Sequence, residues 1–316
     1  MRNYLVTGAA GFIGSWVARA LLERGDKVTV IDNLSTGFKE NIPAQADFFL
    51  SDCQDPKVYK KISGRRFDAI LHIAGQSSGE ISFDNPVYDL RSNTESTLHL
   101  LKFALQTGCK RFIYASTMSV YGLPNQDTPV AEDAQLKPLS FYGVGKIASE
   151  HYLRIYEKFG IQPTSLRLFN VYGPGQNLSN LRQGMISIYL AQMIQNQRIV
   201  VKGSLERFRD FVYISDVVSA FLLTLDNPQT CGGIFNIATG RKTTVKELLG
   251  FLLDAHGKRV PIETAEGTPG DTFGIYADIS RFKNLTGFGP AVSLEKGLKL
   301  MLSWAKEREK NELPSL

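Results

Sequence analysis

The sequence contains little cysteine, histidine and tryptophan, and it has no long apolar run. Its three cysteines, Cys53, Cys109 and Cys231, form no CxxC pair, and an odd number favours reduced thiols over a disulfide framework. With only four scattered histidines, no metal site is expected. No apolar run approaches the roughly 20 residues that cross a bilayer, and the chain begins with an apolar strand pattern rather than a charged leader. These absences predict a cytoplasmic protein without a membrane partner.

Charge of either sign is also modest, with 36 basic and 31 acidic residues and a net charge of +5. A nucleic-acid-binding protein more often gathers its basic residues in a patch, and no basic run occurs here. We therefore expect no nucleic-acid partner, although a few arginines and lysines could meet an anionic substrate. A chain of 316 residues can form one large domain or two modest ones.

Short apolar segments alternate with helical patterns in the first half of the chain. Strands are predicted at 3–7, 27–32, 69–73, 111–116 and 164–169. Helices are predicted at 15–23, 87–107 and 141–158. This alternation predicts an α/β fold of the Rossmann type, with a doubly wound parallel sheet and right-handed crossovers.

The pattern changes after residue 170. Residues 170–180 and 257–274 are turn-rich, and between and beyond them we expect helices at 185–195 and 294–307 and strands at 199–202 and 211–213. We interpret this part as a smaller, discontinuous lobe over the carboxyl ends of the sheet. The sheet domain then comprises residues 1–169 and 209–238, and the smaller lobe comprises residues 170–208 and 239–316.

A glycine-rich segment, Thr7-Gly8-Ala9-Ala10-Gly11-Phe12-Ile13-Gly14, joins the first strand to the first helix. Glycines at this spacing allow a tight turn and close approach of the backbone to a pyrophosphate, which meets the free N–H groups of the helix. Asp32 follows about 20 residues on, where an acid accepts hydrogen bonds from the adenosine ribose. Its charge would repel a 2′-phosphate, so the segment predicts NAD rather than NADP. The alternative is a nucleotide-free turn with Asp32 as a surface residue.

Tyr142 and Lys146 are spaced so that a helix would place both on one face. A free phenol loses its proton near pH 10, but a neighbouring ammonium and a positive nicotinamide ring would let Tyr142 act as a base near neutrality. Gly143 and Gly145 are poor helix formers, so something is expected to pass close to this helix. Thr117 follows a strand at the ligand-binding edge of the sheet. The pair alone is common by chance; with Thr117 and the glycine loop it predicts a catalytic trio.

These motifs together resemble the extended short-chain dehydrogenase/reductase family. Within it they resemble the nucleotide-sugar epimerase/dehydratase group, which includes proteins similar to UDP-glucose/UDP-galactose 4-epimerase. The resemblance covers nearly the whole chain, and its segments are 7–14, 32–37, 71–74, 116–122, Tyr142 with Lys146, 167–170 and 209–213. It implies a nucleotide-diphosphate sugar as substrate and NAD as cofactor.

The resemblance also implies a role for individual residues. NAD would be held by Gly8, Gly11, Phe12, Ile13, Gly14, Asp32, Asn33, Asp52, Cys53, Ala74, Asn93, Tyr142 and Lys146. Catalysis would fall to Thr117, Tyr142 and Lys146, and the substrate would contact Thr117, Tyr142, Asn170, Arg209 and Asp271. The family often has an arginine before the Pro-Gly-Asp at 269–271, but Thr268 stands there in this sequence. Either one phosphate contact is missing, or another residue such as Arg182 supplies it. Helices at 87–107 and 141–158 would pair across a two-fold axis in a homodimer.

The family includes epimerases, 4,6-dehydratases, decarboxylases and keto-reductases. Its dehydratases typically follow the catalytic threonine with Asp-Glu, and related dehydratases and decarboxylases often keep a Glu two residues after it. Here those positions are Met118 and Ser119, which cannot serve as carboxylic acids. We therefore expect epimerisation, at C4, through a transient keto-sugar with NAD tightly bound. The alternatives are a dehydrogenase or keto-reductase with net cofactor turnover, and a non-catalytic NAD-binding regulator, which would tend to lose the tyrosine or the lysine.

Overall fold

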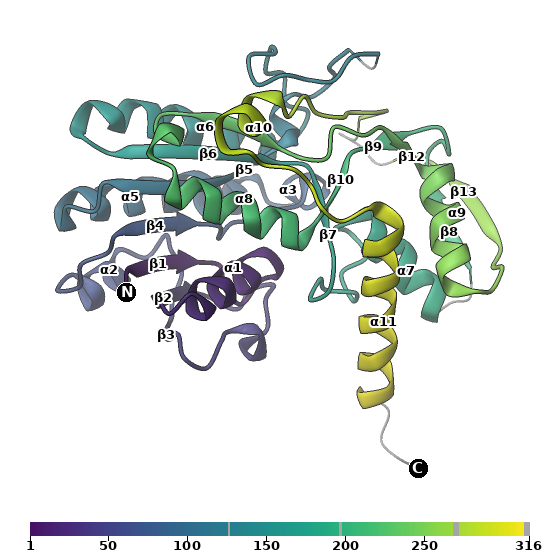
Figure 1. Cartoon of the computed structure of the whole chain (residues 1–316), viewed down its shortest axis with the longest axis horizontal. Helices are drawn as coiled ribbons and strands as arrows, with labels where there is room; N and C mark the ends of the chain where they lie inside the picture. Colours follow the sequence, from purple (N-terminus) through teal and green to yellow (C-terminus); the bar gives the residue numbers. More distant parts are fainter. Residues whose placement is uncertain (126, 196–197, 268–271, 313–316) are drawn as a thin grey trace.

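The computed structural model describes residues 1–125, 127–195, 198–267 and 272–312. A parallel sheet of seven strands forms its centre, in the order β3-β2-β1-β4-β5-β6-β11 (Figure 1). The strands are β1 (Asn3–Thr7), β2 (Lys27–Asp32), β3 (Asp47–Leu50), β4 (Ala69–His72), β5 (Arg111–Thr117), β6 (Gln162–Leu168) and β11 (Ile234–Ile237). The order reverses between β1 and β4, and such a switch point opens a ligand-binding crevice at the carboxyl ends of the strands. The predicted doubly wound fold is confirmed.

Alternation along the strands divides the core into two layers. In β1, Leu5 belongs to one layer, whereas Tyr4 and Val6 belong to the other. The first layer is packed by α2 (Pro56–Ile62), α5 (Ser96–Thr107) and α6 (Phe141–Tyr156), and the second by α1 (Phe12–Glu23) and α8 (Ile214–Asp226). Both faces of the sheet are therefore covered, which leaves the carboxyl ends of its strands as the place for a site.

The helix predicted at 87–107 is interrupted by a wider turn. It consists of α4 (Pro86–Leu90), the π-helical turn η2 (Arg91–Glu95) and α5. Thr97 Oγ1 donates to the carbonyl of Asn93 at 2.7 Å within this stretch. A π turn inside a helix often lies at a functional site, because the extra residue re-aims the side chains around it. Here the side chain placed by the turn is Asn93, which is fully buried.

A second group of elements stands to one side of the sheet in Figure 1. It contains α7 (Met185–Gln195), β8 (Ile199–Lys202), α9 (Val245–His256), β13 (Ile262–Ala265) and α11 (Leu294–Glu312). β8 pairs with β13 in parallel, and α9 packs on α11. Two short pairs, β7 (Asn170–Tyr172) with β10 (Phe211–Tyr213) and β9 (Phe208–Arg209) with β12 (Thr243–Thr244), lie outside the main sheet.

Several elements differ from the expectations of the sequence pattern. The sheet-edge strands β3 and β11 were not predicted, nor were α2, α8, α9 and α10 (Ser280–Thr286). The segment 170–180, expected as loop, begins with β7, and the turn-rich segment 257–274 contains β13. All four residues of β13 are exposed, so this strand lacks the alternation of apolar and polar residues by which a half-buried strand is found.

Cys53, Cys109 and Cys231 are all free thiols. In the described part of the chain, no helix combines the length and apolarity that crossing a membrane requires. Nor do three or more His, Cys, Asp or Glu side chains gather there in a way that could hold a metal ion.

Candidate active site

The glycine-rich turn between β1 and α1 is packed so tightly that only glycine fits at its main positions. Gly8 has a φ of 77°, and a Cβ added there would lie 2.7 Å from the Ala74 amide nitrogen. A Cβ at Gly14 would lie 2.1 Å from the Gly8 carbonyl oxygen. Gly11 begins α1 without any side-chain cap, so the positive end of the helix faces the cleft beside the turn.

This cleft is lined by most of the residues predicted to hold the cofactor. They are Gly8, Gly11, Phe12, Ile13, Gly14, Asp32, Asn33, Asp52, Cys53 and Ala74. The Asp32 carboxylate is 7% exposed and accepts hydrogen bonds from the amides of Ala10 at 2.9 Å and Leu34 at 2.7 Å. Burial raises the pKa of Asp32, whereas these amides lower it. Asn33 Nδ2 donates to Asp52 Oδ2 at 2.8 Å, so the polar residues at this end form one cluster.

The cleft has the donors and acceptors that a dinucleotide requires. The uncapped start of α1 can receive a pyrophosphate. At the other end, the buried Asn93 Oδ1 has no hydrogen-bond partner. A Cβ on Gly75, which lines the cleft, would lie 2.4 Å from this oxygen. A buried acceptor without a donor is costly unless a ligand supplies one, so the residues present fit NAD.

The structure brings Thr117, Tyr142 and Lys146 together at the end of β5. Ser140 caps α6 by accepting from the Gly143 amide at 3.2 Å, which places Tyr142 and Lys146 in its first two turns. Lys146 Nζ lies 5.7 Å from the centroid of the Tyr142 ring and donates to the Ala115 carbonyl at 2.9 Å.

The protonation of the trio is governed by burial. Burial raises the pKa of Tyr142 to about 12, although hydrogen bonding with Thr117 lowers it. Burial lowers the pKa of Lys146 to about 8, against the attraction of Asp89 and Glu150. Tyr142 is therefore not yet a base near neutrality, and further positive charge beside it would be needed.

The close approach expected at Gly143 and Gly145 is observed. A Cβ on Gly143 would lie 2.8 Å from the Ser119 carbonyl oxygen. A Cβ on Gly145 would lie 3.3 Å from Thr94 Oγ1 and 3.5 Å from Asp89 Oδ2. The segment after β5 and the α4–η2 stretch thus both pack directly on the helix that carries Tyr142.

A second cleft adjoins the first and is lined by both Asn170 and Arg209. Arg209 is 3% exposed, and its guanidinium donates to the carbonyls of Phe208 at 2.7 Å and Thr272 at 2.8 Å, which hold it in place. The described lining residues include the cations Arg182, Lys202, Arg207 and Arg209 and the single acid Glu80. Excess positive charge of this kind suits an anionic ligand. Thr268 and Asp271, which the sequence also placed near the substrate, lie outside the described residues.

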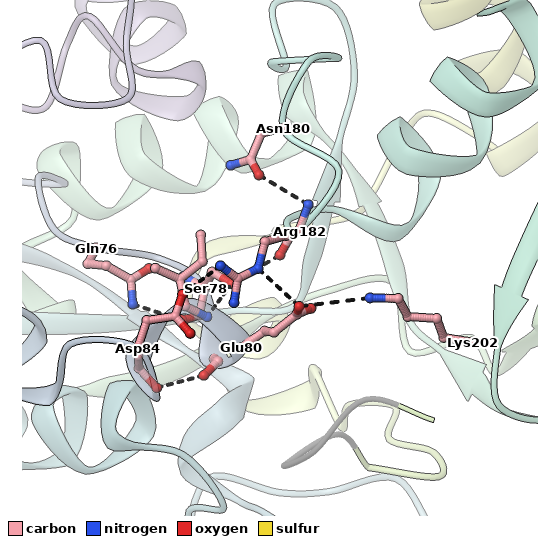
Figure 2. A network of polar contacts seen from close by, with 10 residues as sticks. Gln76, Ser78, Glu80, Asp84, Asn180, Arg182 and Lys202 are labelled. Atoms are coloured by element: carbon pink, nitrogen blue, oxygen red, sulfur yellow. Dashed lines mark hydrogen bonds and ion pairs between the residues drawn. The ribbon is translucent and has the colours of Figure 1, made fainter. Parts of the chain in front are cut away.

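Arg182 is engaged by carboxylates rather than left as a free phosphate contact. Figure 2 shows its guanidinium between Glu80 at 3.0 Å and Asp84 at 2.6 Å, while Lys202 approaches Glu80 at 3.8 Å. Ser78 Oγ donates to the Arg182 carbonyl at 3.0 Å. These contacts join the loop before α7 to α3 (Gly79–Ser82). Because Glu80 and Asp84 hold its guanidinium, the position of Arg182 does not support the suggestion that it supplies the phosphate contact.

The two clefts meet between the residues that precede α3 and those that precede α7. Ser77 and Gln183 line both, and Gln183 Nε2 donates to Ser77 Oγ at 2.5 Å. Met118 and Ser119 line the second cleft next to Thr117. Thr117 Oγ1 donates to Ser119 Oγ and accepts from the Ser119 amide, both at 3.2 Å. A ligand in the second cleft would thus extend toward the trio and the cofactor cleft.

A family model described as "NAD dependent epimerase/dehydratase family" matches residues 4–238. The chain belongs to this family. A UDP-glucose 4-epimerase of Mycolicibacterium smegmatis is 32% identical and covers 93% of this chain and 95% of its own length. The UDP-glucose 4-epimerase of Thermotoga maritima, solved with UDP-glucose, has a TM-score of 0.94 at 35% identity, over 97% of this chain and 99% of that one. The enzyme of Thermus thermophilus, solved with NAD, has a TM-score of 0.89 at 32% identity, over 96% and 99%.

The predicted membership of the extended short-chain dehydrogenase/reductase group is confirmed, and with it the predicted cofactor, NAD. The predicted enzyme class, an NAD-dependent nucleotide-sugar epimerase, agrees with these relatives. Sequence reasoning overlooked several polar residues at the site, among them Gln76, Asp89 and Glu150. Asp89 could have been noticed because it lies four residues before Asn93, on the same face of a helix.

Proposed function

We propose that this enzyme inverts C4 of the hexose of a UDP-sugar, with UDP-glucose and UDP-galactose as the substrate pair. The observation that carries the proposal is that the two clefts share Ser77 and Gln183, and that the second is lined by Met118 and Ser119, which directly follow Thr117 of the trio. A nucleotide-diphosphate sugar in the cationic second cleft would present its sugar to Tyr142, beside the cofactor cleft. Bound NAD would supply the hydride acceptor and donor.

Each residue of the trio has a distinct task in this proposal. Tyr142 Oη removes the proton of the C4 hydroxyl and returns it after the keto-sugar has rotated in the cleft to present its opposite face. Thr117 Oγ1 hydrogen-bonds the same sugar oxygen and orients it. Lys146 supports the phenolate electrostatically and holds the nicotinamide ribose. Asn170 and Arg209 contact the diphosphate, for which a guanidinium offers forked donors, and Asp271 is a further proposed substrate contact.

The remaining cofactor residues and the domain division belong to the same proposal. Asp32, Asn33, Asp52 and Cys53 would surround the adenosine, and Asn93 would face the nicotinamide side. The NAD-binding lobe, residues 1–169 and 209–238, is supported by the place of β11 in the main sheet. The sugar-nucleotide lobe, residues 170–208 and 239–316, is supported by the place of β8 and β13 outside it.

Dehydration and decarboxylation are disfavoured by the acid content of the second cleft. Met118 there accepts a contact from Asn170 Nδ2 at 3.3 Å, and Ser119 bonds Thr117. Glu80, the acid among the described lining residues, is paired with Arg182 and Lys202. Removing water from a sugar needs further acid and base groups near it, and these side chains do not provide them.

Incubation of the purified enzyme with single UDP-sugars tests the function. We expect UDP-glucose and UDP-galactose each to give a mixture of both by proton NMR, with no net change in NADH absorbance at 340 nm. The alternative, a nucleotide-sugar dehydrogenase or keto-reductase, would consume or produce NADH in proportion to product. A 4-keto-6-deoxy product would contradict the proposal.

Cofactor discrimination should depend on Asp32. Its buried carboxylate at the end of β2 would repel a 2′-phosphate, so NAD should bind more tightly than NADP. We expect Asp32→Ala to reduce this preference by at least about tenfold, measured by isothermal titration on nucleotide-stripped protein. Asp47→Ala, a control in β3 whose carboxylate pairs with Arg65, should leave the ratio unchanged. Equal affinities of the unmutated enzyme for NAD and NADP would refute the assignment.

We also place the enzyme in the cytoplasm as a homodimer that pairs α4, α5 and α6. This face exposes several apolar side chains, with Val87 61%, Leu90 57% and Val144 54% exposed. Sedimentation should therefore give a particle of twice the 35.1 kDa chain. Val144→Asp should yield the monomer, and Leu300→Asp, on the similarly exposed α11, should not. A monomer of the unmutated chain at micromolar concentration would argue against the dimer.

A further inference from the structure

Asp89 is a buried carboxylate beside the trio to which the mechanism above assigns no task. It lies in α4 and is 1% exposed. Its Oδ1 accepts hydrogen bonds from Gln76 Nε2 at 2.8 Å and from Asn93 Nδ2 at 3.2 Å. Burial raises the pKa of Asp89, whereas Gln76, Lys146 and Asn93 lower it. A charge buried at this depth is costly unless partners compensate it, so its position calls for an explanation.

Asp89 approaches α6 closely because Gly145 has no side chain. A Cβ at Gly145 would lie 3.5 Å from Asp89 Oδ2. Gly145 directly precedes Lys146, whose ammonium is itself buried, with 3% of the residue exposed. The carboxylate therefore lies against the helical turn that carries the one lysine of the trio, in a region where charges are weakly screened.

Asp89 and the Gln76 carbonyl together determine which way the Asn93 amide points. Both groups only accept hydrogen bonds, and Asn93 Nδ2 donates to them at 3.2 and 3.0 Å, respectively. Its Oδ1 is then turned toward Gly75, where it has no partner within the chain. A Cβ on Gly75 would lie 2.4 Å from Asn93 Oδ1 and 3.6 Å from Lys146 Nζ. The unpartnered acceptor and the ammonium thus border the same point in the wall of the cofactor cleft.

The other groups that face Lys146 do not offer the same charge. Glu150, on the same helix, is already paired with Arg167 through bonds of 3.0 and 2.7 Å. Tyr114 from β5 and Tyr142 present aromatic rings. His72 from β4 is neutral, since burial lowers its pKa to about 3. Among the described residues facing Lys146, Asp89 is the carboxylate that no arginine neutralises.

We propose that Asp89 is a positioning residue that keeps Lys146 charged and, with the Gln76 carbonyl, holds Asn93 turned toward the cofactor. This inference rests on the proposed function for its catalytic meaning, but the electrostatic coupling it describes exists without any sugar. Its signature follows from a simple rule: removing an anion makes every nearby acid easier to deprotonate. Loss of the Asp89 charge should therefore lower the pKa of Tyr142 and the pKa of Lys146 together.

The test is Asp89→Asn, which keeps the shape of the side chain and an oxygen for both hydrogen bonds. In the kcat–pH profile of the NAD-loaded enzyme, the acidic limb reports deprotonation of Tyr142 and the alkaline limb reports deprotonation of Lys146. Both limbs should move to lower pH by about one unit. Glu95→Gln, which removes a partly exposed charge from the neighbouring π turn, should move neither limb. A lower rate with both limbs unmoved would show that Asp89 is only structural.

A measurement without sugar separates this inference from the proposed function. The ¹³Cζ signal of Tyr142, identified by its absence in Tyr142→Phe, can be titrated in the NAD-loaded enzyme. Asp89→Asn should lower its pKa by the same unit, whether or not UDP-glucose is a substrate. Asp89→Ser, which keeps one hydrogen-bond acceptor but no charge, should give the same shift and serves if the first variant does not fold. An unchanged Tyr142 titration in a folded variant would overturn the proposal.

Discussion

Tyr142→Phe is expected to abolish epimerisation while leaving the fold and NAD binding nearly unchanged. The substitution removes the hydroxyl that would carry the C4 proton but keeps the buried ring. General acid–base catalysis typically contributes about 10²–10⁴-fold in rate, so a loss of that size or larger should appear in kcat. Steady-state turnover of UDP-galactose measures the loss, and thermal melting with NAD titration verifies that fold and cofactor binding persist.

Two further variants serve as comparisons for Tyr142→Phe. Thr117→Val should cost less than Tyr142→Phe, because it removes a hydrogen bond that orients the sugar rather than the base itself. Tyr4→Phe also removes a buried phenol hydroxyl, near the amino end of β1 and away from the clefts, and should leave kcat unchanged. If Tyr142→Phe kept most of its activity, the proton would leave by another route and the mechanism would be wrong.

Local patterns were sufficient to predict the two strands and the glycine turn at the centre of the cofactor cleft. The strands predicted at 3–7 and 27–32 coincide with β1 and β2. Each is a short apolar run, and the glycine turn after the first and the acid at the end of the second mark where the strand ends. The glycine turn was also predictable, since Gly8 and Gly14 stand where backbone approach excludes a Cβ. These are short-range constraints, and a single sequence contains them in full.

The parts that were not predicted depend on long-range packing. β3 and β11 are edge strands of four residues each, and what defines them is pairing with β2 and β6 rather than their own pattern. Similarly, the sequence shows neither the burial of Asp89 nor the carboxylate partners of Arg182. Burial makes Asp89 part of the site, whereas pairing with Glu80 and Asp84 occupies Arg182.

Lys146→Met should reduce both turnover and the retention of NAD. The change replaces the ammonium with an apolar chain of similar length, so Tyr142 loses its nearest cation and the ribose loses a donor. Burial raises the pKa of Tyr142 to about 12, and the variant removes the ammonium beside it that would favour the phenolate. We expect kcat to fall about 10²-fold or more, together with weaker NAD binding.

Cofactor retention distinguishes Lys146→Met from Tyr142→Phe. NAD released by acid from the purified protein should be near one per chain in Tyr142→Phe and well below that in Lys146→Met. Lys102→Met, a control at an exposed position of α5, should match the unmutated enzyme in both measurements. The buried Glu150 remains paired with Arg167 in this variant, so the fold should persist, with Asp89 taking up a proton to avoid an uncompensated charge. If Lys146→Met retained NAD fully but had a reduced kcat, Lys146 would support the Tyr142 phenolate but would not hold the nicotinamide ribose.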